Sequence, residues 1–295
     1  MRHIFSEVQN FLGPNILGTL VTAAFGAFAG AWVASRRETK RSVVAELNSI
    51  NAARALCFSI SNKFLGLKGQ HILNLHRDYS IDREVVLATL AAANAGAQVN
   101  QLQVRCDLQT FPPVWLPIGT LERLIFEKIS IRGRALIAAI DLVAAIDFLE
   151  KSIGYRNELI LEIQRQSPPL SQRQLIDRYF GLPSPQDSID ERFSTNIAAL
   201  YAQTDDCIFF SQILAEDLFS YGTALRKRYA KRFRLGVRKL VREDWTIAES
   251  RGLLPSRQKY AKWLGGFRTH PTRFERIKRW CGLGGNPVAI STRTP

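Results

Sequence analysis

Few residues of this 295-residue chain are suited to catalysis, and those few are widely spaced. The sequence holds four histidines, of which His71 and His76 are five positions apart. On a helix that spacing separates their side chains by about 140°, which does not suit a shared metal ion. The four cysteines lie far from one another and form no C-x-x-C pair, so the sequence indicates neither a zinc site nor a disulfide framework.

Known catalytic motifs are also missing from the sequence. The segment GLGGNP, Gly282–Pro287, lacks the preceding strand and the following Lys-Ser/Thr of a phosphate-binding loop. No G-x-S-x-G, H-E-x-x-H or protein-kinase motif is found. The acidic pairs Glu158/Glu162 and Asp205/Asp206 are predicted to lie on solvated helix faces. We therefore predict a non-enzymatic protein with no catalytic residue, cofactor or metal ion.

Positive charge is the chemical property that stands out. The formal net charge is +14, and the whole excess lies in residues 226–295, which hold 19 Lys and Arg against 4 Asp and Glu. Aromatic residues such as Tyr229 and Phe233 alternate with these cations. That mixture suits nucleic acid or an anionic membrane surface, and the same rings could equally form the core of a small subdomain. The residues predicted to bind an acidic protein, anionic lipid or nucleic acid are Arg226, Lys227, Arg228, Lys231, Arg232, Arg234, Arg238 and Lys239.

A second group of cations follows an uncharged run, Ile16–Ser35. The twenty residues of this run would span about 30 Å as a helix, the thickness of a bilayer's hydrocarbon core, so we predict a transmembrane helix. The cations that follow are Arg36, Arg37, Lys40 and Arg41. By the positive-inside rule they place residues 1–15 outside and the rest of the chain in the cytoplasm. The predicted location is a bacterial-type inner membrane or a plasma membrane, with the N-terminus out.

Small residues recur at every fourth position of the uncharged run. Close approach of a second helix is typical of such a face, and Gly26 and Gly30 form a G-x-x-x-G pair, so we predict a homo-oligomer. Small residues are also common in membrane helices without any such role. A cleaved signal peptide is the competing interpretation, but the cations lie after the run rather than before it. The residues of the predicted packing face are Gly18, Thr22, Gly26, Gly30 and Ala34.

Apolar residues spaced three and four positions apart predict an all-α fold with three long helices, at about residues 36–78, 120–167 and 187–235. The second spacing begins at Ile125 and Ile129, and the first comprises Ile50, Ala53, Cys57, Ile60, Phe64 and Leu67. Joined by turns, these helices should form an elongated antiparallel bundle or coiled coil, running up, down and up from the membrane. A second membrane span at Ala135–Leu149 is disfavoured, because Asp141 would lie inside it.

Two further regions complete the predicted organisation. Residues 236–295 contain three short capped segments, namely a Thr-x-x-Glu box at Thr246–Glu249, a run that begins at Ser256, and a second box at Thr272–Glu275. These residues are predicted to form a small basic helical subdomain, about 60 Å from the membrane. Residues 99–109 alternate between polar and apolar, as a strand does, yet no partner strand is found, so a helix is favoured there.

These features together predict a single-pass membrane scaffold or sensor subunit that presents a basic tail to an acidic partner. A membrane-tethered nucleic-acid-binding protein is the first alternative, because the tail combines cations and rings. A subdomain that binds anionic lipid is the second.

Overall fold

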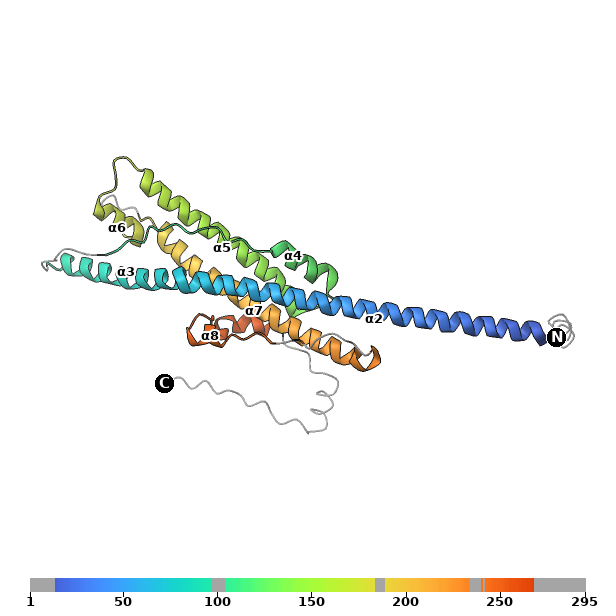
Figure 1. Cartoon of the computed structure of the whole chain (residues 1–295). Coiled ribbons are helices and arrows are strands. Elements are labelled where there is room, and N and C mark those ends of the chain that lie inside the picture. Colours follow the sequence, from blue (N-terminus) through green and yellow to red (C-terminus); the bar gives the residue numbers. More distant parts are fainter. Residues whose placement is uncertain (1–13, 97–103, 184–188, 234–239, 241, 268–295) are drawn as a thin grey trace, which may run out of the picture. The chain divides into compact units, whose positions relative to one another are not determined.

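The computed structural model describes residues 14–96, 104–183, 189–233, 240 and 242–267, with the side chains described from Thr19 onward (Figure 1). The predicted all-α class is confirmed: the regular elements of the described residues are all helices, and their one β-bridge joins Pro183 to Ile189. The chain divides into two compact units, residues 1–254 and 255–295.

The first element of the larger unit is one continuous helix over residues 14–94. It comprises α2 (Pro14–Leu67), the π-helical η1 (Lys68–Ile72) and α3 (Leu73–Asn94). The helix therefore extends beyond the predicted end near residue 78, and it stops before Gly96, which has a φ of 83°. Proline at the first position and glycine after the last are the usual boundaries of a helix.

The core stripe of α2 follows the spacing read from the sequence. Side chains three and four positions apart are almost completely buried, because they face the same neighbouring helix. They are Val43, Leu47, Ile50, Ala53, Cys57, Ile60 and Phe64.

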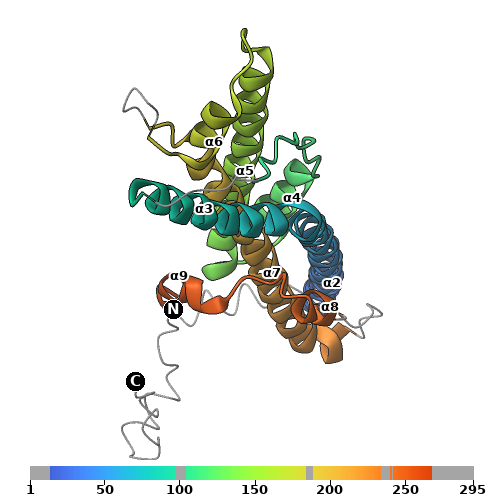
Figure 2. The ribbon, with the colours of Figure 1, turned by 90° about the vertical axis from the view of Figure 1, so that its left-hand side faces the viewer.

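Two further long helices, α5 (Arg134–Arg165) and α7 (Arg192–Phe233), complete the bundle. The helix α7 packs against both α2 and α5 (Figures 1 and 2). The predicted helical bundle is thus confirmed.

The second long helix begins later than predicted. Residues 118–128 form the short α4 (Ile118–Arg123) and the π-helical η2 (Leu124–Lys128), and the backbone then becomes extended at Ile129. Gly133 has a φ of 67° and a ψ of −131°, a conformation open mainly to glycine, so α5 can start only at the next residue. The apolar spacing had predicted one continuous helix through this region. Ile125 and Ile129, which belong to that spacing, are indeed buried, although the helix is interrupted between them and α5.

The predicted up, down and up order of the helices is wrong. Contacts at both ends show that α7 runs antiparallel to α2: Lys68 Nζ lies 2.6 Å from Asp205 Oδ1, and Arg36 Nη2 lies 3.0 Å from the main-chain oxygen of Arg232. The helix α5 is antiparallel to α7 in turn, since Asn196 Nδ2 donates to Ser152 O near one end and Arg134 pairs with Asp217 near the other. The helices α2 and α5 therefore run in the same direction, and α7 returns.

The return between α3 and α4 is made by a segment that is neither helix nor strand over residues 104–117. Helix was favoured for residues 99–109, and this prediction is wrong for residues 104–109; residues 97–103 lie outside the described residues. Two prolines, Pro112 and Pro113, oppose helix here.

Side chains of α5 hold this segment in place of a partner strand. The side-chain amide of Asn157 accepts a hydrogen bond from Phe111 N at 2.9 Å and donates one to Phe111 O at 2.8 Å. Arg156 donates to Asp107 O.

After α7 the described chain returns along α2 as a segment that we call the strap, residues 240 and 242–254. Glu243 Oε1 accepts from Arg54 Nη2 at 2.6 Å, and the Trp245 ring lies 5.1 Å from the Phe58 ring. The strap contains α8 (Thr246–Ser250), which the sequence predicted from a Thr-x-x-Glu box. Near the end of the strap, the main-chain oxygen of Leu253 accepts a hydrogen bond from Lys68 Nζ.

The smaller unit, residues 255–295, is described only as far as residue 267. It contains the 3-10 helix η3 (Arg257–Tyr260) and α9 (Ala261–Gly265). Ser256 accepts from Gln258 N before the first turn, as its position before a helical run suggested. The box predicted at residues 272–275 lies outside the described residues.

The predicted transmembrane helix is not supported by the described part of the chain, where we find no helix with both the length and the hydrophobicity that a bilayer crossing requires. The predicted span starts at Ile16, ahead of the first described side chain. Every side chain from Thr19 to Glu38 is exposed.

Candidate functional site: a cationic belt on two antiparallel helices

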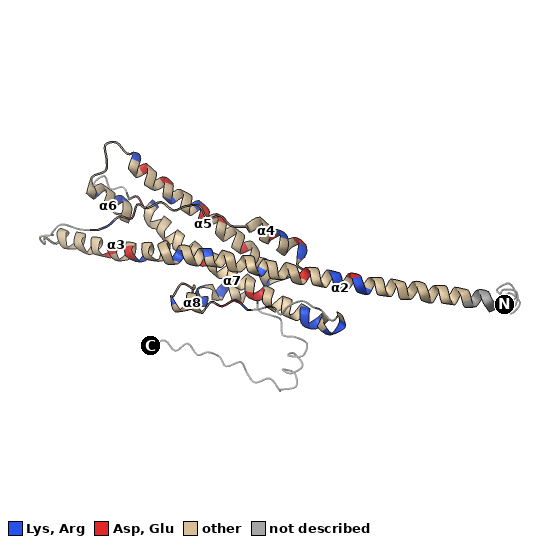
Figure 3. Cartoon of the chain, viewed as in Figure 1, with Lys and Arg blue, Asp and Glu red and all other residues tan. Residues whose placement is uncertain are grey.

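Two groups of cations that are far apart in the sequence lie side by side in the structure (Figure 3). One belongs to α2 and the other to the end of α7, because antiparallel packing brings residue 36 level with residue 232. We call these nine residues the cationic belt: Arg36, Arg37, Lys40, Arg41, Arg226, Lys227, Arg228, Lys231 and Arg232. The other predicted anion-binding residues, Arg234, Arg238 and Lys239, lie outside the described residues.

A specific hydrogen bond joins the two halves of the belt. The last carbonyl groups of a helix have no intrahelical donor, and they carry the negative end of the helix dipole. At the end of α7 the guanidinium of Arg36 donates to one of these, the oxygen of Arg232. The contact thus satisfies a terminal carbonyl and holds the two cationic groups together.

The positive charge of the belt is poorly compensated. From residue 218 to residue 242 the sequence contains no Asp or Glu, and between residues 16 and 45 it contains only Glu38. Among the ion pairs formed by described residues, none includes a residue of the belt. All nine side chains except that of Arg226 are exposed, so the belt projects a positive potential into its surroundings.

Aromatic side chains accompany the belt. The guanidinium of Arg36 lies 5.4 Å from the ring centroid of Trp32, which is 54% exposed. On α7 the rings of Tyr229 and Phe233 stack with centroids 5.6 Å apart, and the guanidinium of Arg232 lies over Phe233. Each ring combines an apolar body with a neighbouring cation, the composition that is enriched where proteins meet the membrane interface.

The predicted packing face of small residues contacts no other part of the described chain closely. A Cβ atom added to Gly26 or Gly30 would have no atom within 4 Å, apart from the neighbours along the helix itself. Thr22 and Ala34 are exposed as well, and the side-chain position of Gly18 lies outside the described residues. The predicted contact with a second copy therefore stays a prediction.

A buried ion pair was missed by the sequence analysis, which placed Asp205 on a solvated face. The side chain of Lys68 is 2% exposed and donates to Asp205 Oδ1 at 2.6 Å and to Leu253 O at 2.9 Å. Lys68 is the first residue of the π-helical η1, and Ile72 at the other end of η1 is buried too. No local pattern marked Lys68 as internal, because its partners come from distant segments.

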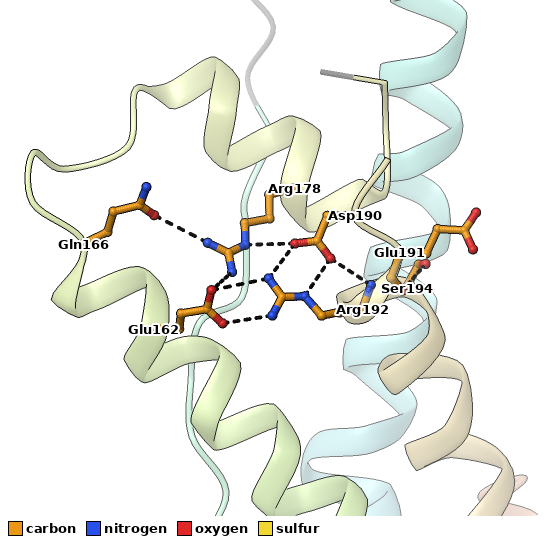
Figure 4. Close-up of polar contacts among 7 residues, drawn as sticks. All are labelled: Glu162, Gln166, Arg178, Asp190, Glu191, Arg192 and Ser194. Carbon is orange, nitrogen blue, oxygen red and sulfur yellow. Dashed lines mark hydrogen bonds and ion pairs between the residues drawn. The ribbon is translucent and has the colours of Figure 1, made fainter. Parts of the chain in front are cut away.

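A second group of charges joins the ends of α5, α6 (Gln172–Phe180) and α7 (Figure 4). Glu162 accepts from Arg178 and Arg192, and Asp190 pairs with the same two arginines. Hydrogen bonds from Arg178 and Arg192 lower the pKa of Glu162, and the bond from Arg192 lowers that of Asp190. Both carboxylates thus stay ionised at neutral pH, which suits a clamp between helices and not a proton-transfer site.

A polar cavity of about 550 Å³ lies between α3, residues 105–111 and Tyr179. Its lining includes Asp78, Asp82 and Cys106. Burial raises the pKa of the Cys106 thiol to about 11, so this cysteine is not an activated nucleophile. Among the described residues, no group of His, Cys, Asp and Glu is arranged to hold a metal ion.

Comparisons of the chain with protein-family models, with curated proteins and with solved structures find no match. Function is therefore inferred from the chain's own surface. The feature with the clearest chemistry is the cationic belt, which directly follows the exposed apolar part of α2.

Proposed function

We propose that the protein is a membrane-anchored helical scaffold, held in the bilayer by the apolar N-terminal part of α2. The observation that carries the proposal is the exposure of large apolar side chains there. Phe25 is 71% exposed, Phe28 is 73% exposed, and Leu20, Val21, Trp32 and Val33 are between 40% and 56% exposed. Apolar groups of this size are normally removed from water, and each gains about 1.5–3 kcal/mol when fully buried.

A bilayer suits this surface better than a groove on a partner protein. Val21, Phe25, Phe28 and Trp32 share one face of the helix, because they are spaced three and four positions apart. Leu20 and Val33 widen this apolar surface to more than half of the circumference, and the remaining face carries small uncharged residues. Together with Ile16 and Leu17 the uncharged run is twenty residues long, which matches the hydrocarbon core. The cations of α2 then favour a cytoplasmic bundle and an external N-terminus.

The construction of the bundle supports a scaffold role. Helix α7 packs against both α2 and α5, and the Lys68 pair and the Glu162 network tie distant segments together. In this proposal the chain has no catalytic activity of its own, and the small-residue face of α2 pairs two anchors in the membrane.

The experiment compares the membrane fraction of cells that express the full chain with that of two double variants. Changing Phe25→Lys and Phe28→Lys places two charges inside the apolar part, and each costs about 2.5–3.5 kcal/mol at the centre of a membrane helix. We expect this variant to appear in the soluble fraction or to be extracted by alkaline carbonate, while the wild-type chain resists extraction.

The matched control is Ile81→Lys with Val85→Lys. These two α3 residues are also apolar and exposed, at 53% and 47%, but they lie outside the proposed anchor. The control should remain in the membrane. Carbonate extraction of the wild-type chain, or equal retention of the Phe25/Phe28 variant, would contradict the anchor.

A further inference from the structure

We propose that the cationic belt binds the headgroups of anionic phospholipids in the same membrane that holds α2. This inference rests on the proposed anchor and assigns a ligand to the surface beside it. It concerns a part of the chain, the end of α7, that the sequence analysis placed about 60 Å from the membrane.

The position of the belt is the first argument. The apolar part of α2 ends at Val33, and Arg36 follows within about 4.5 Å along the helix axis. Because Arg36 contacts the main chain of Arg232, the end of α7 lies at the same level. If the apolar part is inside the bilayer, both halves of the belt lie within one Debye length, about 10 Å, of the headgroups.

The composition of the belt is the second argument. Eight of its nine cations are exposed, and none is paired with a carboxylate of the described chain, so they are available for lipid phosphates and carboxylates. Lys and Arg at this level can extend their heads toward the interface while their stems stay on apolar surface. Trp32 and Tyr229 occupy the same zone, where amphipathic rings are enriched.

The setting also favours lipid over nucleic acid. A belt at the base of an inserted helix faces the membrane surface, which carries a negative potential on the cytoplasmic side. A nucleic acid would have to approach that surface against the repulsion between like charges. The headgroups, by contrast, are already in place and need no further association step.

Binding at two points has a mechanical consequence. A bundle attached through α2 alone could tilt freely about the membrane boundary. With the end of α7 also held on the headgroups, and with Arg36 linking the two helices, the tilt of the bundle is restricted. The lipid contact thus fixes how the scaffold faces the cytoplasm.

The experiment places the full chain in lipid nanodiscs of two compositions, phosphatidylcholine alone and phosphatidylcholine with phosphatidylserine. A fluorophore on Ala224→Cys, in a chain with Cys106→Ser and Cys281→Ser, reports the proximity of α7 to a quencher attached to lipid headgroups. We expect stronger quenching in the discs that contain phosphatidylserine. High salt should abolish the difference, because the Debye length falls to about 3 Å at 1 M.

The test variant is Lys227→Gln, Arg228→Gln and Lys231→Gln, which removes three exposed cations of the belt. It should lose the difference between the two compositions. The matched control is Lys128→Gln, Lys151→Gln and Arg165→Gln, three exposed cations elsewhere on the bundle, and it should keep the difference.

The outcomes separate this inference from the anchor. Failure of the wild-type chain to enter nanodiscs contradicts the anchor and the inference together. Entry with equal quenching in both compositions, or an unchanged difference in the belt variant, overturns the lipid site alone. Loss of the difference when a single-stranded oligonucleotide is added, at a concentration where phosphatidylserine vesicles have no effect, would assign the belt to nucleic acid.

Discussion

Lys68 shows what a single buried charge does in this bundle. Its ammonium group joins three segments, because it donates to Asp205 on α7 and to Leu253 at the end of the strap while its own backbone belongs to η1. The ring of Tyr201 lies 5.3 Å away and covers the pair. Removing one member of such a pair leaves the other charge buried without its partner, which is far less favourable than losing an exposed ion pair.

We predict that Lys68→Met lowers the free energy of unfolding by about 3–5 kcal/mol. The measurement is denaturant unfolding of the full chain, followed by circular dichroism. The double variant Lys68→Met/Asp205→Leu should recover most of the loss, because both charges are then absent. Lys151→Met, which breaks the exposed pair with Asp147, serves as the control and should cost less than about 0.5 kcal/mol. A Lys68 variant as stable as this control would show that the pair contributes nothing.

Close approach between elements depends on Gly222. A Cβ atom at this position would lie 2.8 Å from Leu240 Cδ1 on the strap and 3.0 Å from Ile50 Cγ2 on α2. Both distances are shorter than ordinary van der Waals contact, so a side chain there would push α7 away from its neighbours. Glycine at this point of α7 thus permits the packing of three segments, at some loss of helix propensity.

We expect Gly222→Val to destabilise the larger unit by about 2 kcal/mol through overpacking. Gly154→Val on α5 is the matched control, because no atom lies within 4 Å of its added Cβ. The control should change stability by less than about 0.5 kcal/mol. Thermal unfolding of the two variants beside the wild-type chain measures the difference, and equal midpoints for both variants would contradict the packing argument.

The sequence was informative where structure depends on neighbouring residues. Spacing of apolar residues correctly indicated the helical bundle and the buried stripe of α2, including Cys57 and Phe64. It failed at Gly133, where one backbone conformation ends a helix although the apolar spacing continues. It also failed for Asp205, because nothing local distinguishes a carboxylate facing water from one facing a lysine 137 positions away.

The direction of α7 decides how the whole unit can act. Three helices joined by turns suggested an alternating order. The alternation over residues 99–109 did resemble a strand, but helix was favoured there, so the sequence analysis did not predict that residues 104–117 would return the chain without a helix. Because they do, α7 runs back toward the start of α2, and the basic segment lies beside Arg36 instead of at the opposite end. The two cationic groups, separated by almost two hundred residues, can then act as one surface.

This arrangement predicts a short distance between spin labels at Lys40→Cys and Lys227→Cys, in a chain with Cys106 and Cys281 changed to Ser. Packed helices have axes about 8–10 Å apart, so two flexible labels at the same level should lie within roughly 20 Å. If α7 ran in the opposite direction, the stretch from Asp205 to Lys227 would separate the labels by at least about 30 Å more. Double electron–electron resonance on the full chain in nanodiscs measures the distance.

A pair Lys40→Cys/Lys151→Cys provides a longer reference, because Lys151 lies on the part of α5 that packs near Asn196, at the start of α7. If the Lys40/Lys227 distance is as long as this reference, the belt does not exist as one surface, and its two halves must have separate roles.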